Sequence, residues 1–263
     1  MSARMTLLLI EKLFALAAIL QTLEWMSLRP AWSESGVFRW SLLRDDFRTF
    51  PAFLRGFFDA VLSERGFAHL LRLRLACAIL LVLTPGMGPF VALLLFVVST
   101  STLLISMRWR GSFNGGSDSM TFHVSLALFF AAVFAKSQTV ALGSLGYIAF
   151  HLTLSFFVSG VAKLASPAWR SGHALRQLVT TSNYGPPAIF ARLLSQPALS
   201  FLLGWLIIVF ECAFPFAFFM EGSVMMIIVT ALFFHILNYC LFGLNRFFFA
   251  WLAAYPVLFF FNR

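Results

Sequence analysis

The chain has 263 residues, of which 60% are hydrophobic and only 11% are charged. Soluble domains carry about 25% charged residues, so this chain has too few charges to cover a soluble globule of its size. Its formal net charge is +9. The basic residues lie at the ends of apolar segments, where they normally meet lipid head groups, and this placement excludes a nucleic-acid partner.

The three cysteines, Cys77, Cys212 and Cys240, lie singly within apolar segments. Without a CxxC pair the sequence predicts no disulfide framework and no structural zinc, and the scattered histidines predict no metal site. The first apolar segment is long and contains Glu11 and Lys12, which favours a retained membrane span over a cleaved signal peptide.

Apolar segments close to the length of a bilayer crossing, about 20 residues, recur along the chain. They predict an all-α, multi-pass helical bundle in the membrane, formed by a single transmembrane domain over residues 1–263. We expect about eight transmembrane helices, or seven if the short fourth segment is re-entrant, in a bacterial inner membrane. The predicted spans are residues 7–28, 67–83, 90–107, 120–135, 140–161, 198–219, 223–242 and 247–261.

Residues 29–67 form a polar connection whose second half, 47–62, spaces its apolar residues at helical intervals. This pattern is typical of an amphipathic helix in the membrane interface, although a short helix packed on the bundle would share it. A second polar segment, 164–197, is broken by prolines and predicts two short helices, His173–Thr180 and Ala188–Leu194.

Acidic residues in the first span have two expected positions. Glu11 lies near the span end, where an acid can reach the head groups. Gln21, Glu24 and Trp25 fall on one helix face, and intramembrane charges usually face the bundle interior. We therefore expect Glu24 to point inward, as a structural or charge partner.

A row of polar residues marks the fifth predicted span. His151, Ser155, Ser159 and Lys163 follow one another at four-residue steps, which places them on one slanted ridge of a helix. A lysine at a span end normally extends to the interface, and a single serine normally bonds its own helix. Because the full row ends at Lys163, we interpret this lysine as a candidate general base.

Other polar residues complete the candidate site. His235 and Asn238 share a face of the seventh span and can orient a carbonyl oxygen or hold two helices together. Glu211 could pair with Lys163 or with an arginine, or stay protonated. The glycine-rich segment 108–118 allows close approach of a ligand, although taken alone it favours an ordinary loop. Asn114 and Asp118 are its candidate binding residues.

Two sequence blocks resemble a known family. The first is Gly160-Val161-Ala162-Lys163-Leu164 with Trp169 and Gly172, and the second is Phe234-His235 with Asn238, Leu241-Phe242-Gly243 and Tyr255-Pro256-Val257-Leu258-Phe259. Together they are similar to the horizontally transferred transmembrane (HTTM) domain over roughly residues 100–260. This domain is the membrane core of vitamin K-dependent gamma-glutamyl carboxylases and their bacterial relatives.

The resemblance implies a chemistry. In the carboxylases, the lysine that matches Lys163 is the base that starts oxygenation of a reduced vitamin K, and the oxygenated quinone then deprotonates a glutamate side chain. It implies a reduced naphthoquinone, of the vitamin K or menaquinol type, as cofactor. If the chemistry carries over, Lys163 is the base, and His235 and Asn238 line the quinone pocket. Together with the residues singled out above, the candidate catalytic residues are Lys163 and His235. The candidate substrate- or quinone-binding residues are Asn238, Trp169, Gly172, His151, Asn114 and Asp118, and the candidate structural or charge partners are Glu211, Glu24 and Arg170.

The sequence also departs from the carboxylases. The segment 135–139 lacks the histidine found in the matching carboxylase loop, and the large extra-membrane domain of the carboxylases has no counterpart after the last span. Smaller relatives include bacterial membrane proteins that mature secreted peptide toxins. We therefore predict a carboxylase-like lyase, a lysine-based, quinol-linked enzyme that modifies or matures a peptide. A separate soluble or membrane partner is also expected.

The alternative is a non-catalytic partner or scaffold subunit of a peptide maturation or secretion system. A quinone-linked redox subunit is disfavoured because no flavin, haem or thiol motif is visible. The orientation is open, because the distribution of arginines places the Lys163 side in the cytoplasm, whereas the resemblance implies the opposite side.

Overall fold

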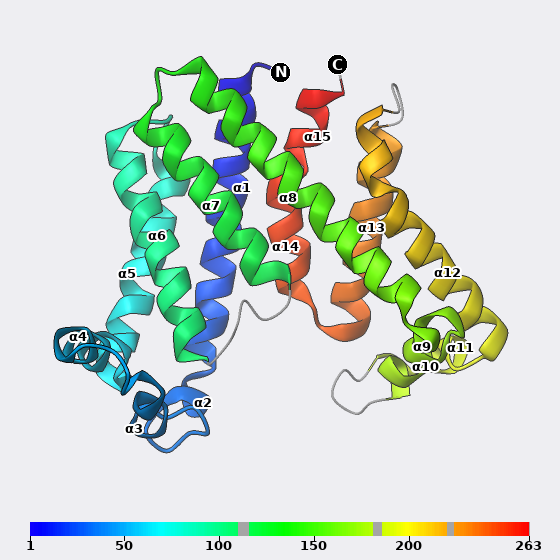
Figure 1. The fold of residues 1–263 in the computed structure, drawn as a ribbon, viewed down its shortest axis with the longest axis horizontal. Coiled ribbons are helices and arrows are strands. Elements are labelled where there is room, and N and C mark those ends of the chain that lie inside the picture. Colours follow the sequence, from blue (N-terminus) through cyan, green and yellow to red (C-terminus); the bar gives the residue numbers. More distant parts are fainter. Residues whose placement is uncertain (110–115, 181–185, 220–223, 263) are drawn as a thin grey trace. The chain divides into compact units, whose positions relative to one another are not determined.

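The computed structural model describes residues 1–109, 116–180, 186–219 and 224–262, and these residues form helices and connecting segments without a strand (Figure 1). The predicted all-α class is therefore confirmed. The chain divides into two compact units, one formed by residues 3–145 and the other by residues 146–263 with the first two residues. We call them the N-terminal and C-terminal units.

The N-terminal unit is a bundle of four long helices, α1 (Ala3–Ser27), α5 (Glu64–Leu83), α6 (Pro89–Arg108) and α7 (Gly116–Val133). Helix α1 packs against α5 and α7, and α6 packs against the same two helices (Figure 1). The interior is aliphatic and aromatic. Its fully buried side chains include Ile10, Phe14, Leu71, Leu81, Leu95 and Leu128.

The polar connection folds over one end of this bundle as α2 (Arg29–Trp32), α3 (Trp40–Leu43), the 3-10 helix η1 (Arg44–Phe47) and α4 (Ala52–Leu62). The predicted helix was expected to start at residue 47, but α4 starts after Pro51. A residue that precedes proline is disfavoured in the α conformation, which accounts for the later start.

Helix α4 is amphipathic, as predicted. Its buried face contributes Phe58 and Leu62 to an aromatic cluster with Trp32 and Phe67, so the helix packs on the bundle end. Its opposite face leaves Phe53 and Phe57 exposed. The structure therefore shows a helix packed on the bundle, and its position in the membrane interface stays a prediction.

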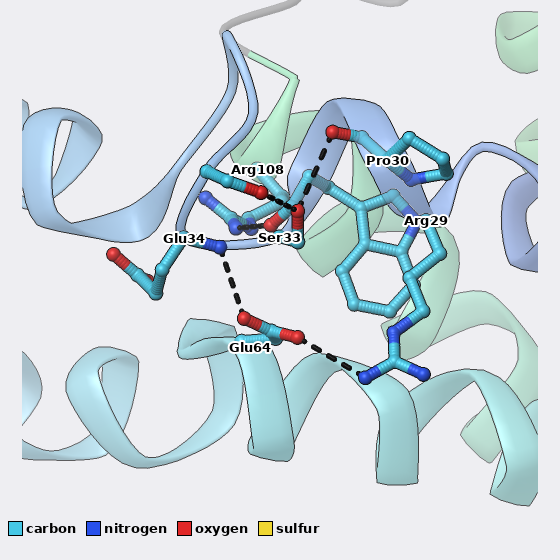
Figure 2. A network of polar contacts seen from close by, with 8 residues as sticks. Arg29, Pro30, Ser33, Glu34, Glu64 and Arg108 are labelled. Carbon is cyan, nitrogen blue, oxygen red and sulfur yellow. Dashed lines mark hydrogen bonds and ion pairs between the residues drawn. The ribbon is translucent and has the colours of Figure 1, made fainter.

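Glu64 and Arg108 tie the polar connection to the bundle (Figure 2). One oxygen of Glu64 accepts a hydrogen bond from the backbone N–H of Glu34 at 2.9 Å, and the other accepts one from Arg29 at 3.3 Å. Arg108, fully buried at the end of α6, donates from Nη2 to the carbonyl of Trp32 at 2.7 Å. The connection is therefore fixed to both α5 and α6.

Arg74, an arginine in the middle of α5, is fully buried and bonded to neutral acceptors. Its Nε donates to Thr22 Oγ1 at 3.0 Å, its Nη1 to the carbonyl of Val98 at 2.8 Å, and its Nη2 to Gln21 Oε1 at 2.7 Å. Gln21 in turn donates from Nε2 to Asp118 Oδ1 at 2.9 Å. Gln21 therefore faces inward as expected and links the arginine to a carboxylate.

Glu11 differs from its expected position. Its side chain is fully buried and lies 2.9 Å from Lys12 Nζ, so it does not reach the head groups. Lys12 Nζ donates to the carbonyl oxygens of Leu81 and Thr84, where α5 ends and its last carbonyls lack helical partners. The lysine thus links α1 to the end of α5, and Glu11 compensates its charge.

The C-terminal unit is built on α8, which spans Gln138–Ala165 and begins in the N-terminal unit. The two predicted short helices are confirmed. The further elements are α9 (Pro167–Arg170), α10 (His173–Thr180), α11 (Ala188–Leu194), α12 (Pro197–Ala213), the 3-10 helix η2 (Phe214–Phe219), α13 (Val224–Phe242), α14 (Asn245–Ala254) and α15 (Pro256–Phe261).

Within the described residues, six helices are long and apolar enough to cross a membrane: α1, α5, α6, α8, α12 with the start of η2, and α13. Helix α7 has 18 residues and is not among these six. The last predicted span is divided into α14 and α15 at Tyr255 and Pro256, because proline ends the preceding hydrogen-bonded turn. The protein is therefore a polytopic membrane protein, and the count of eight spans stays a prediction.

Replacing Arg74 by glutamine should lower the free energy of unfolding by about 3 kcal/mol, because several buried acceptors lose their charged donor together. Chemical unfolding of the detergent-solubilised protein measures this loss. The matched control is Arg55→Gln in α4, whose side chain is exposed. Equal losses in the two variants would show that the buried network does not stabilise the bundle.

Candidate functional site

A cavity of about 240 Å³ lies within the C-terminal unit. Helices α8, α12, α13 and α14 contribute to its walls, together with the short helices α9 and α10. Most of the lining is apolar or aromatic, and the polar side chains are Ser155, Ser159, Lys163, Glu211, His235 and Asn238. The other lining residues are Phe156, Trp169, Leu175, Leu178, Ile207, Phe234, Phe242, Leu244, Phe247 and Trp251.

Lys163, near the end of α8, is paired with Glu211 of α12. Its Nζ lies 2.7 Å and 2.9 Å from the two carboxylate oxygens and donates to Ser159 Oγ at 2.5 Å. It also lies 5.3 Å from the centre of the Trp169 ring, within the range of a cation–π interaction. The lysine therefore faces inward, and three oxygens surround its three N–H donors.

Glu211 is the more deeply buried partner, with 4% of its side chain exposed against 16% for Lys163. Of the alternatives open for Glu211, the structure shows the pairing with Lys163. Ser159 adds a third member, because its Oγ lies 3.4 Å from the same carboxylate. Together these three residues form a compact polar cluster on an otherwise apolar wall.

The predicted polar ridge of α8 divides into two parts. Ser155, Ser159 and Lys163 line the cavity, although Ser155 donates its hydroxyl to the carbonyl of Leu152 at 2.7 Å. His151 is not among the described lining residues and lies against the Tyr147 ring, with 4.4 Å between ring centres. The slow rotation of a four-residue step around the helix carries His151 away from the cavity.

The two glycines of the first sequence block lie where helices approach closely. A Cβ on Gly160 would lie 2.7 Å from the backbone nitrogen of Cys212 and 2.9 Å from Cβ of Glu211. Gly172 has a φ of +71°, and a Cβ there would lie 2.5 Å from the nitrogen of Phe201. Both glycines therefore bring α12 against α8 and the short helices, and Gly172 itself is not among the lining residues.

His235 of α13 is almost fully buried, with 3% exposed, and neither ring nitrogen has a hydrogen-bond partner among the described residues. The rings of Phe234 and Trp251 each lie 5.2 Å from it, centre to centre. Asn238, one turn later, lines the same cavity. A buried, unpartnered polar group is costly, so these nitrogens are suited to a ligand oxygen or hydroxyl.

The remaining predicted residues lie elsewhere. Asp118 belongs to the N-terminal unit, where it accepts the hydrogen bond from Gln21, and Asn114 lies outside the described residues. Arg170 is exposed, and its backbone carbonyl accepts a bond from Trp205. Glu24 is half-buried. Roles of these residues in binding or charge pairing stay predictions.

Trp251 and Phe247 of α14 are cavity residues that the sequence analysis did not single out. Their rings are stacked, with 5.2 Å between centres and 10° between planes. Tyr255 follows Trp251 by four residues and is 2% exposed, and its hydroxyl has no partner among the described residues. The spacing of Phe247, Trp251 and Tyr255 at four-residue steps was the available signal, since it places all three on one helix face.

The fold and the cavity define a polytopic α-helical membrane protein with a paired lysine on the wall of an aromatic cavity. Residues 122–262 match the HTTM domain, which is more than half of the chain, so the chain belongs to the HTTM domain family. The match begins at residue 122, later than the start near residue 100 that the resemblance predicted. It contains all the described residues that line the cavity. No curated protein and no solved structure shows a significant match to the chain.

Adding a methyl group to Gly160 should separate α8 from α12. We expect Gly160→Ala to lower the free energy of unfolding by about 1–3 kcal/mol, because the new Cβ overlaps backbone rather than a flexible side chain. Thermal and chemical unfolding in detergent measure the change. Gly146→Ala, on the same helix with nothing within 4 Å, should be neutral or stabilising by up to about 1 kcal/mol. Similar losses in both variants would contradict the close approach at Gly160.

Breaking the Lys163–Glu211 pair on one side should cost more than removing both charges. Lys163→Met leaves a buried carboxylate uncompensated, with an expected loss of about 3–5 kcal/mol. The double variant Lys163→Met/Glu211→Gln removes both charges and should recover most of this stability. The measurement is a double-mutant cycle of unfolding free energies, and additive losses would show that the two charges do not interact.

Proposed function

We propose that this protein is a membrane enzyme that uses Lys163 as a general base on a membrane quinol and that modifies or matures a peptide. The observation that carries the proposal is the juxtaposition in one cavity of a paired lysine, aromatic walls and a histidine that has no hydrogen-bond partner within the described parts of the chain. Membership of the HTTM domain family supports it, because the carboxylase-like members use the matching lysine in this way. In this proposal the protein lies in a bacterial inner membrane, and the resemblance to bacterial relatives supports that location.

The cavity suits a flat ring that carries oxygen atoms. Aromatic side chains supply the walls, and stacking or edge contacts with a naphthoquinone ring would be favourable. His235 Nδ1 and Nε2 and the Asn238 amide offer hydrogen bonds to a hydroxyl or carbonyl oxygen. A reduced naphthoquinone, when bound, would supply base-activated reactivity toward oxygen.

Lys163 needs a lone pair before it can act as a base. In the structure its amine is surrounded by the two Glu211 oxygens and by Ser159. Transfer of one proton from Nζ to a Glu211 oxygen would turn the ion pair into a neutral amine and a carboxylic acid. In this proposal Glu211 holds that proton, Lys163 then accepts the hydroxyl proton of the quinol, and Trp169 keeps the amine at the cavity wall.

The same cluster also favours a second function, that of a non-catalytic membrane partner in peptide maturation or secretion. Every N–H donor of Lys163 has an oxygen beside it, so the pair can serve solely to hold α8 against α12. A scaffold of this kind needs the stability that the pair provides and not the amine itself. It should therefore tolerate removal of both charges together.

The test compares the wild-type protein with the Lys163→Met/Glu211→Gln variant in lipid discs. We expect oxygen-dependent conversion of a reduced naphthoquinone to its epoxide by the wild type, and a rate lower by about 100-fold or more in the variant, the usual contribution of a general base. Product analysis by mass spectrometry measures the epoxide. Gly146→Ala, away from the cavity, serves as the active control.

Equal epoxide formation by wild type and double variant would exclude Lys163 as the base. If neither folded protein forms epoxide, while the double variant still supports peptide maturation in cells, the scaffold function is favoured. The folded state of each variant is checked by its unfolding transition, so that a loss of activity is separated from a loss of structure.

A further inference from the structure

A second cavity, of about 270 Å³, lies in the N-terminal unit, outside the residues that match the HTTM domain. It is formed where α1 ends and α5 begins. Its lining combines apolar side chains with a group of basic ones. The residues are Met26, Arg29, Trp32, Glu64, Arg65, Ala68, His69, Leu71 and Arg72.

Positive charge dominates this cavity. Its three arginines face one carboxylate, Glu64, which leaves an excess of two positive charges among these four side chains. Glu64 is already engaged by Arg29 and by the backbone of Glu34 (Figure 2). Arg65 and Arg72 make no side-chain hydrogen bond or ion pair with any described residue, and both are exposed. Their guanidinium groups are therefore available to an anion.

The basic residues continue into an apolar strip on α5. Arg65, His69 and Arg72 follow at steps of four and three residues, so they lie on one face of the helix. Leu73, one residue further, is 52% exposed, and the same exposed face extends toward the other end of α5. The exposed apolar residues of this strip are Leu73, Ile79, Leu80 and Leu83.

This order of groups matches an amphiphile in a bilayer leaflet. Helix α5 is long and apolar enough to cross a membrane and begins at Glu64, so Arg65 lies in its first turn. Arg72 lies about 10 Å further along the axis than Arg65, at about 1.5 Å per residue. A phosphate held by these arginines would place its attached acyl chains along Leu73 and the leucines beyond it.

We propose that the cavity between α1 and α5 and the exposed strip of α5 form a binding site for an anionic glycerophospholipid. Arg65 and Arg72 hold the phosphate, and Leu73, Ile79 and Leu80 contact an acyl chain. The excess of positive charge favours an anionic lipid over a zwitterionic one, whose head group brings a cation of its own. Basic pockets between membrane helices are a known setting for acidic lipid head groups.

The test is lipid titration of the detergent-solubilised protein followed by native mass spectrometry. Phosphatidylglycerol should bind the wild type more tightly than phosphatidylcholine of the same acyl chains. Arg65→Gln/Arg72→Gln should weaken phosphatidylglycerol binding by about 30-fold, the loss expected from two basic residues at an anionic lipid surface. The matched control is Arg4→Gln/Arg192→Gln, which removes the same charge from two exposed arginines that do not line the cavity.

Three results would overturn the proposal. One is equal binding of the two lipids by the wild type, and another is an equal loss in the control variant. The third is competition by glycerol phosphate at concentrations comparable to those of the lipid, which would indicate a site for a soluble phosphate. Arg65 and Arg72 have no side-chain partner to lose, so all variants should show the wild-type unfolding transition, and this is checked beside each titration.

Discussion

The ion pair between Lys163 and Glu211 is the constraint on which the C-terminal unit depends. Two charged groups on apolar helices are tolerable only when they meet, because either one alone would be buried without compensation. Meeting requires that α8 and α12 lie within van der Waals contact, and Gly160, with Cys212 and Glu211 against its Cα, permits that approach. Gly172 does the same for the turn between α9 and α10, which lies against α12 and brings Trp169 over the lysine. The first sequence block thus encodes a lysine together with the packing that holds its carboxylate in place.

The N-terminal unit also buries two arginines. Arg74 donates to hydroxyl, amide and carbonyl oxygens, and Gln21 links it to the carboxylate of Asp118. Arg108 donates to a backbone carbonyl and lies over the rings of Trp40 and Phe67 at 5.6 Å and 5.5 Å. Both arginines are enclosed, whereas Lys163 and Glu211 lie on a cavity wall. An enclosed arginine can only stabilise the fold, whereas a charged pair on a cavity wall can exchange a proton with a molecule bound in that cavity. The proposed chemistry is therefore assigned to the C-terminal unit.

The positions of the long helices could be predicted from the sequence, because the length and apolarity of a segment are local properties and determine whether it forms a membrane helix. The sequence also indicated Lys163, Trp169, His235 and Asn238 as site residues. These residues lie on α8, α9 and α13, and the fold brings them to one cavity. The prediction failed where the partner of a residue is non-local. Helical spacing shows which residues share a face but not which neighbour that face meets. The contact of Lys12 with the end of α5, the burial of Glu11 beside Lys12 and the Arg74 network could therefore not be predicted from spacing. His151 was included in the predicted site because its spacing continues the polar ridge of α8. Where the cavity ends along α8 depends on the position of α13 and α14, which the sequence does not show.

The polar groups on the cavity wall differ in their hydrogen bonding, and the proposed occupant has to suit both kinds. Each N–H donor of Lys163 has an acceptor beside it, whereas His235 is buried and neither of its ring nitrogens has a partner among the residues that the structure describes. A purely apolar ligand, such as a lipid chain, would leave the histidine without a hydrogen bond and would offer no group that could exchange a proton with the lysine. A ring with hydroxyl groups can accept from or donate to His235 and present a proton to the amine. The proposed quinol satisfies both requirements with one molecule. The apolar strip of α5 in the other unit has no such buried polar group and suits an acyl chain.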